Sequence, residues 1–294
     1  MVSVRVPATT ANLGPGFDCL GLALDLYARF DFQLLPSGLE ITGCREEESG
    51  EDNLVYRAYI HTLKFFSLDS LGLRLHIDSD IPLSRGLGSS AACVAGGILG
   101  AAALHGLSLS DGEALKLASE LEGHPDNAAP AIYGGLRVSL MEDGRALSLP
   151  CAVHPALRFL ALVPDFELRT ADARAALPQS VPLKDAVYNL SHTAFLLKAL
   201  EGGDPELIRL AMKDRLHQDA RFRLIPGAAA LKERMEEIGA AACCLSGAGP
   251  TMLCLYTGDD FLNRAMEAAR TEFPRFDPRP LSLCGEGACV TQRS

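Results

Sequence analysis

The segment Gly86-Leu87-Gly88-Ser89-Ser90 leads directly into a stretch rich in alanine and glycine. Glycines let a backbone turn so that several N–H groups face one point, and the N-terminus of a following helix adds partial positive charge. The two serines add hydroxyl groups. Such a loop suits the phosphates of a nucleotide, and the alternative is an ordinary glycine turn capped by serines.

Other nucleotide-binding motifs explain this loop less well. No Gly-Lys-Ser/Thr closes it, which excludes a P-loop. The spacing Gly86-x-Gly88-x-x-Ala91 imitates the dinucleotide fingerprint, but that motif needs its first glycine at the end of a strand. Here residues 79–85 separate the predicted strand from Gly86. A protein-kinase loop would be followed by His-Arg-Asp and Asp-Phe-Gly, and neither occurs downstream.

Regular elements are predicted on both sides of the loop. Residues 71–77 alternate apolar and polar side chains, which indicates a half-buried strand. Residues 86–110 carry no charged side chain, but their apolar run 91–104 is shorter than the roughly 20 residues of a membrane span. We therefore expect a small-residue helix packed on a sheet. A second helix is predicted from the N-cap Ser110 to Gly123.

The chain divides near residues 150–155, which gives two expected domains, 1–152 and 153–294. The first domain opens with Val2, Val4 and Val6, an alternation typical of a strand. The second mixes helices and strands around a glycine turn at residues 246–250. Its expected strands are 159–163, 241–245 and 252–256, and its expected helices are 184–200, 205–216, 228–238 and 261–272. This second half therefore resembles an α+β sandwich.

Composition restricts the possible partners. The chain has 294 residues, 48% of them hydrophobic, which indicates a folded globular protein. A net charge of −10 argues against general nucleic-acid binding, because phosphate contacts need clustered basic residues. Nine cysteines without a CxxC pair predict reduced, mostly buried thiols. No secretory signal is visible, so we expect a cytoplasmic protein that binds neither membrane nor nucleic acid.

Three segments, in order along the chain, resemble the motifs of the kinases named for galactokinase, homoserine kinase, mevalonate kinase and phosphomevalonate kinase (GHMP kinases). Residues 7–18 resemble the N-terminal substrate motif of that family, and residues 245–251 resemble its C-terminal glycine loop. The central segment resembles its ATP loop, which comprises Pro82, Leu83, Ser84, Arg85, Gly86, Leu87, Gly88, Ser89, Ser90, Ala91 and Ala92.

This resemblance implies a two-domain GHMP kinase fold. Its N-terminal, ATP-binding domain is α/β and like ribosomal protein S5, and its C-terminal domain is a ferredoxin-like α+β sandwich. The resemblance also implies ATP and Mg²⁺ as cofactors. Residues 122–130, 170–174 and 216–227 resemble the homoserine kinases within the family. The implied reaction is therefore phosphorylation of the L-homoserine hydroxyl to O-phospho-L-homoserine, a step of threonine synthesis.

Two alternatives remain beside it: a sister kinase acting on another small alcohol such as mevalonate, and a nucleotide-binding regulator without turnover. The segments 122–127 and 170–174 argue against the first, and intact Ser90, Glu120 and all three glycine loops argue against the second. The oligomeric state is left open, a homodimer included.

The resemblance implies the catalytic residues Ser90, Glu120 and Asn127. Ser90 would offer its hydroxyl to Mg²⁺ and Glu120 would supply the carboxylate of the metal, with Glu122 as a rival two residues away. Asn127 stands where sister kinases carry an Asp, so the family implies transfer without a protein base.

The implied acceptor site draws on both halves of the chain. A guanidinium fork suits a carboxylate, which assigns Arg174 and Arg221 to that group. Asp219-Ala220 replaces a more usual Pro-Tyr, which leaves Arg223 as the alternative to Arg221. Asp18 would face the ammonium. The implied substrate-binding residues are Asn12, Asp18, His124, Asp126, Asn127, Thr170, Arg174, Arg221 and Gly247.

Overall fold

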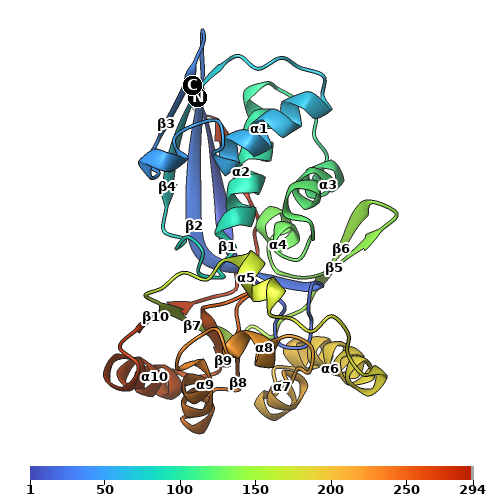
Figure 1. Ribbon diagram of the computed structural model, residues 1–294, viewed down its shortest axis with the longest axis vertical. Helices are drawn as coiled ribbons and strands as arrows, with labels where there is room; N and C mark the ends of the chain where they lie inside the picture. The colour runs from blue at the N-terminus through green and yellow to red at the C-terminus, as the bar shows by residue number, and fades with distance from the viewer. Residues whose placement is uncertain (293–294) are drawn as a thin grey trace.

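The computed structural model describes residues 1–292, which form two sheets with helices packed on each (Figure 1). The larger sheet has seven strands in the order β11-β1-β2-β4-β3, and β5 pairs with both β2 and β6. Its strands are β1 (Val2–Ala11), β2 (Leu20–Leu35), β3 (Leu39–Thr42), β4 (Gly72–Ser79), β5 (Leu136–Glu142), β6 (Arg145–Cys151) and β11 (Cys289–Gln292).

Four helices cover one face of this sheet (Figure 1). They are α1 (Leu54–Phe65), α2 (Ser89–Leu104), α3 (Asp111–Glu122) and α4 (Ala128–Tyr133), and a short 3₁₀ helix, η1 (Glu46–Glu48), precedes them. The predicted small-residue helix is confirmed as α2, which is buried along most of its length. None of the helices in residues 1–292 is long and apolar enough to cross a membrane.

Glycines allow the close packing of α2. A Cβ added at Gly96 would lie 2.3 Å from the Phe30 ring, and one at Gly97 would lie 2.3 Å from the Val55 carbonyl oxygen. The helix can therefore lie directly on β2 and on α1. The predicted capping box at the start of α3 is also confirmed, with Ser110 and Glu113 bonded to each other's backbone.

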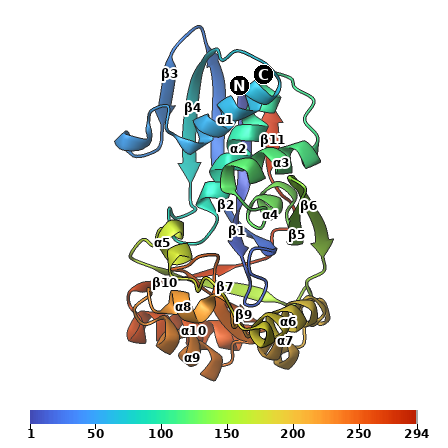
Figure 2. The same ribbon diagram turned by 45° about the vertical axis from the view of Figure 1, so that its right-hand side comes forward.

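The second sheet has four antiparallel strands in the order β10-β7-β9-β8. Its strands are β7 (Arg158–Pro164), β8 (Ala242–Leu245), β9 (Met252–Tyr256) and β10 (Phe276–Leu281). Figure 2 shows most of the helices beneath this sheet and α5 above it, between the two halves. The helices are α5 (Thr170–Ala175), α6 (Leu183–Gly202), α7 (Pro205–Ala211), α8 (Gln218–Phe222), α9 (Ala228–Glu237) and α10 (Asp259–Glu272).

The end of the chain departs from the expected domain division. The passage between the sheets falls between β6 and β7, close to the expected break, but β11 returns to the first sheet and pairs with β1. The expected second domain, 153–294, therefore gives its last strand to the first. No apolar alternation marks β11, because all four of its residues are exposed and backbone hydrogen bonds to the edge of the sheet hold it.

The cysteines are free thiols, as expected, but fewer of them are buried than predicted. The buried ones are Cys243, Cys244, Cys254 and Cys284. Most of the others are half-buried near element ends.

The surroundings of two helical glycines, Gly97 in α2 and Gly112 in α3, predict opposite effects on stability when each is replaced by alanine. Gly97→Ala should destabilise the protein by about 1–3 kcal/mol, because the new methyl group would overlap the backbone of α1. Gly112→Ala, in the first turn of α3, meets open space and should stabilise it by up to about 1 kcal/mol. Urea unfolding of both variants measures the difference, and a Gly97→Ala protein as stable as wild type would contradict this packing.

Candidate active site

A pocket of about 330 Å³ lies between the two halves of the molecule. It gathers all nine expected substrate-binding residues, which come from five separate segments of the chain. Its lining is Asn12, Asp18, Ser84, Gly86, Gly88, Ser89, Ser90, Ala91, Leu121, Glu122, His124, Asp126, Asn127, Leu168, Thr170, Arg174, Arg221, Gly247, Ala248 and Gly249.

The glycine loop forms one wall of this pocket and ends at the N-terminus of α2. Gly86 and Gly88 have φ values of 79° and 70°, the left-handed region that favours glycine. A Cβ at Gly88 would lie 1.9 Å from the Thr9 hydroxyl, and one at Gly86 would lie 2.4 Å from the Ser246 carbonyl oxygen. Both glycines are therefore required by the fold, and the N-terminus of a 16-residue helix opens toward the pocket.

Not every residue of the expected ATP loop lines this pocket. Arg85 turns away and donates from Nε to the Pro164 carbonyl oxygen at 3.0 Å. Leu87 and Ala92 belong to the hydrophobic core. Pro82 and Leu83 line neighbouring hollows instead.

The carboxylate beside Ser90 belongs to Glu122. The Ser90 hydroxyl donates to Glu122 Oε1 at 2.5 Å. Burial raises the pKa of Glu122, and the bond from Ser90 opposes that rise. Glu120 lies outside the pocket, with its Oε2 2.9 Å from His61 Nε2. The structure therefore does not bring Glu120, the carboxylate expected to share the metal with Ser90, to that serine, and Glu122 stands there instead.

The helical periodicity of α3 holds a signal that separates the two glutamates. Glu120 follows Lys116 by four residues and shares its charged face, and the two form an ion pair at 3.7 Å. Glu122 follows the buried Ala118 by four residues, so it projects from the edge of the buried face. That face points toward α2 and Ser90.

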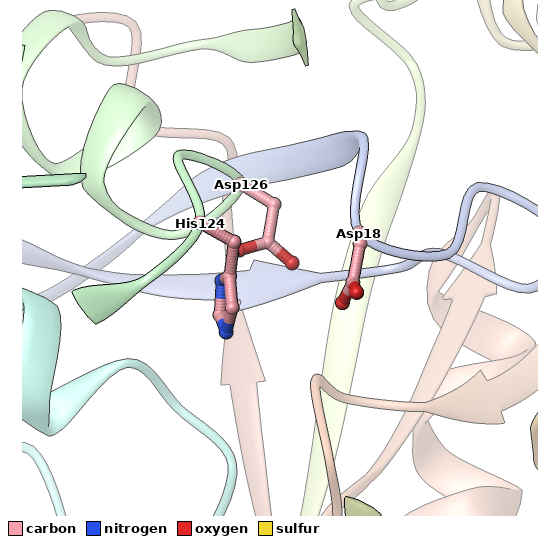
Figure 3. A group of neighbouring side chains, drawn as sticks. All are labelled: Asp18, His124 and Asp126. Carbon is pink, nitrogen blue, oxygen red and sulfur yellow. The ribbon is translucent and has the colours of Figure 1, made fainter. Parts of the chain in front are cut away.

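His124 and Asp126 form a close pair on the loop between α3 and α4, and Figure 3 shows Asp18 on the chain beside them. His124 Nδ1 lies 2.5 Å from Asp126 Oδ1, and Asp126 is 1% exposed. The bond to Asp126 raises the pKa of His124 against the opposing effect of burial. Ligand atoms of all three residues lie within 4.8 Å of one another, so two carboxylates and one imidazole face a shared space suited to a cationic group.

The two expected arginines differ in how their charges are balanced. Arg174 forms a two-pronged pair with Asp18 at 3.0–3.1 Å, and both side chains are partly exposed. Arg221 is 2% exposed and has no carboxylate within ion-pair distance among residues 1–292. It donates to the Gly247 carbonyl oxygen at 3.2 Å, and burial lowers its pKa. The alternative, Arg223, is exposed and lies outside the pocket.

Hydrogen bonds across the chain fix the remaining polar groups. Asn12 Nδ2 donates to the Gly247 carbonyl oxygen at 2.7 Å, and the Thr9 hydroxyl donates to Asn127 Oδ1 at 2.8 Å. Neither Thr9 nor His217 was expected from the sequence to be a functional residue. Two adjacent threonines at the end of an apolar strand, Thr9 and Thr10, were a usable signal, because buried hydroxyls require partners.

Comparison with known proteins agrees with this geometry. The family model for the GHMP kinases N terminal domain matches residues 53–135, and the model for the GHMP kinases C terminal domain matches residues 196–275. The chain belongs to the GHMP kinase family, and it has the expected two-domain α+β fold of these enzymes.

The relatives that match this chain over its full length are homoserine kinases. A homoserine kinase of Clostridium botulinum (strain Loch Maree / Type A3) is 42% identical over 295 residues, which covers 100% of this chain and 99% of the relative. A homoserine kinase of Clostridium beijerinckii is 41% identical, with 99% of each chain covered. The crystal structure of homoserine kinase from Cytophaga hutchinsonii superposes with a TM-score of 0.88 at 28% identity, over 99% of this chain and 97% of that chain.

The His124–Asp126 pair predicts a measurable titration shift. Asp126→Asn keeps an oxygen that can accept a bond but removes the negative charge, so the pKa of His124 should fall. Proton NMR of the histidine ring signals over a pH series measures this change. The control is His105, whose pKa is lowered by burial at the far end of α2 from the pocket and should stay as in wild type. An unchanged His124 would show that Asp126 does not set its charge.

Proposed function

We propose that the protein transfers the γ-phosphoryl group of ATP to the side-chain hydroxyl of L-homoserine, forming O-phospho-L-homoserine. The observation that carries this proposal is the arrangement of charges around one pocket. One wall is a glycine loop at a helix N-terminus, and another holds a buried arginine that forms no ion pair within residues 1–292. The phosphates of ATP complement the first wall, and the carboxylate of a small amino acid complements the second. The full-length homoserine kinase relatives support the same substrate.

Phosphate binding falls to the loop and the first turn of α2. Backbone N–H groups of Gly88, Ser89 and Ser90 lie where the helix dipole favours negative charge. Ser90 and Glu122 present adjacent oxygen atoms, which are the ligands Mg²⁺ prefers, and a buried carboxylate with a raised pKa would be stabilised by a cation. When bound, the ion would neutralise charge on the transferring phosphate. We therefore assign the metal to Ser90 and Glu122 in place of Glu120.

Recognition of the amino acid falls to the other wall. The carboxylate would bind Arg221 and Arg174, and the ammonium would bind Asp18. A zwitterion can exchange the internal Arg174–Asp18 pair for two pairs with its own charges. Mevalonate has no ammonium, so it would leave Asp18 without that gain.

We assign the role of base to none of the carboxylates that line the pocket among residues 1–292, because each already has a polar partner. Asn127 carries an amide that cannot take the proton. Asp126 already accepts from His124 and from the backbone N–H of Asn127 at 2.9 Å. The proton therefore passes to the phosphate, which a loose transition state tolerates because little nucleophilic push is needed. Asn127 holds the loop through its bond with Thr9.

We place this activity in the cytoplasm, where ATP is available and free thiols such as those of this chain persist. A homodimer is compatible with the exposed apolar side chains along α6, namely Leu183, Val187 and Leu190.

A coupled ADP-release assay tests the proposal directly. The purified protein with ATP and Mg²⁺ should release ADP with L-homoserine and should show little turnover with mevalonate or galactose. Omitting Mg²⁺ should abolish turnover. Background rates with homoserine but clear turnover with mevalonate would point to the sister activity. Background rates with every alcohol, together with measurable ATP binding, would point to a nucleotide-binding regulator.

The two glutamates of α3 provide a matched comparison. Glu122→Gln should lower turnover about 10²–10³-fold, because it removes the charge beside Ser90 where the metal–phosphate complex would bind. Glu120→Gln removes a partly exposed charge outside the pocket and should stay near wild type. Steady-state rates at saturating ATP measure both. A dead Glu120→Gln enzyme with an active Glu122→Gln enzyme would reverse the assignment.

A further inference from the structure

His217 is a fully buried histidine immediately before α8 that the proposed reaction leaves without a role. It lies one turn before Arg221, and its ring stacks on Phe17 of the first half with centroids 5.1 Å apart. Both of its ring nitrogens have close partners. A buried imidazole whose two nitrogens both form hydrogen bonds restricts the positions of the groups bonded to it.

The partners of the ring determine its protonation. Arg221 Nη1 lies 3.2 Å from His217 Nδ1, and a guanidinium can only donate, so Nδ1 must be an acceptor. His217 Nε2 lies 2.7 Å from the Gly14 carbonyl oxygen, which can only accept, so Nε2 carries the proton. The imidazole is therefore neutral and held as one tautomer. Burial lowers the pKa of His217, which favours the same neutral state.

The ring joins the two halves of the acceptor site. Gly14 lies in the loop between β1 and β2, which also carries Asn12 and Asp18 of the pocket. Phe17 of the same loop lies beneath the guanidinium groups of Arg221 and Arg174, at 5.2 and 5.7 Å from its centroid. A shift of the histidine ring would move Arg221 relative to this loop.

The backbone of His217 is fixed independently of its ring. Asp214 accepts from the backbone N–H groups of Leu216, His217 and Gln218 at 2.7–3.0 Å. Its carboxylate is thus used by the chain at the start of α8, and its Oδ2 lies 3.8 Å from His217 Nε2. The ring can therefore be changed while the framework of α8 keeps its own bonds.

We propose that His217 is a positioning residue for acceptor recognition: its Nδ1 holds the Arg221 guanidinium at the substrate-carboxylate site, and its Nε2–H ties that arginine to the Gly14 loop. This inference rests on the proposed function, because it assumes that Arg221 binds the carboxylate of homoserine. It adds a residue that contacts no substrate and sets the affinity for one half of it.

His217→Phe is the main test, because phenylalanine keeps the ring, its burial and the stacking on Phe17 but loses both nitrogens. The KM for homoserine should rise about tenfold or more, the range expected when a hydrogen bond to a charged group is lost. The KM for ATP and kcat should change little. His217→Asn can place an amide oxygen near the position of Nδ1 and should recover part of the affinity. His76→Phe, on β4, serves as the control and should match wild type.

A double-mutant comparison with Arg221→Leu separates positioning from general damage. Arg221→Leu should weaken homoserine use strongly, and adding His217→Phe should raise the KM for homoserine little further. Comparison with 3-aminopropan-1-ol, which lacks the carboxylate, gives a second measure. His217→Phe should reduce kcat/KM for homoserine and leave that for the analogue nearly unchanged. A merely structural role would reduce both and would add fully to Arg221→Leu.

The outcomes are distinguishable from failure of the proposed function. If wild type does not phosphorylate homoserine, the function itself is wrong. If wild type is active and His217→Phe keeps its KM for homoserine, or loses affinity equally in the Arg221→Leu background, the positioning role is overturned. If His217→Phe does not fold, His217→Leu makes the same test, because leucine is also apolar and offers neither a donor to Gly14 nor an acceptor to Arg221.

Discussion

The carbonyl group of Gly247 is the point on which both halves of the pocket depend. It accepts from Asn12 Nδ2 of the first half at 2.7 Å and from Arg221 Nη1 of the second half at 3.2 Å. The N–H of the same residue donates to the Ala11 carbonyl oxygen at 3.0 Å. A carbonyl oxygen has two lone pairs, so this one residue can orient two side chains at once.

The same turn also supports the phosphate loop. The Ser246 hydroxyl donates to the Gly86 carbonyl oxygen at 2.6 Å and also contacts the Thr10 hydroxyl at 2.9 Å. The backbones approach so closely that a Cβ at Gly86 would lie 2.4 Å from the Ser246 carbonyl oxygen and 2.6 Å from that of Gly249. A displacement of residues 246–249 would therefore disturb phosphate binding and acceptor binding together. This mutual support explains why two glycine-rich segments about 160 residues apart occur in one chain.

Local patterns made much of this arrangement predictable. Features that depend on neighbouring residues or on familiar motifs could be predicted. They are the phosphate loop, the capping box of α3, the valine alternation of β1 and the pocket residues within the matched segments. Contacts made over long distances were not predictable in the same way. Strand β11 is held by backbone bonds that leave no side-chain pattern, and the Gly14 carbonyl group that pairs with the His217 ring comes from a loop about 200 residues away. The choice between Glu120 and Glu122 could have been predicted in part. The family motif does not distinguish the two residues, but the charged and buried faces of α3 indicate that Glu122 is the one directed toward the pocket.

The two arginines of the pocket differ in how much each can contribute to the free energy of substrate binding. The Arg174–Asp18 pair has side chains 45% and 32% exposed, and pairs of this kind contribute about 0–1 kcal/mol, so exchanging them for a zwitterion costs little. Arg221 is buried, and among residues 1–292 its direct hydrogen-bond partners are carbonyl groups and a neutral imidazole, while carboxylates such as Asp18 act on its charge only from a longer distance. A buried cation without an anion is unfavourable, and an arriving carboxylate relieves that penalty. The larger share of carboxylate selectivity therefore lies with Arg221, while Arg174 and Asp18 mainly orient the amino acid. Because the buried arginine is held by contacts to both halves of the molecule, its selectivity for a carboxylate depends on the relative position of the two halves.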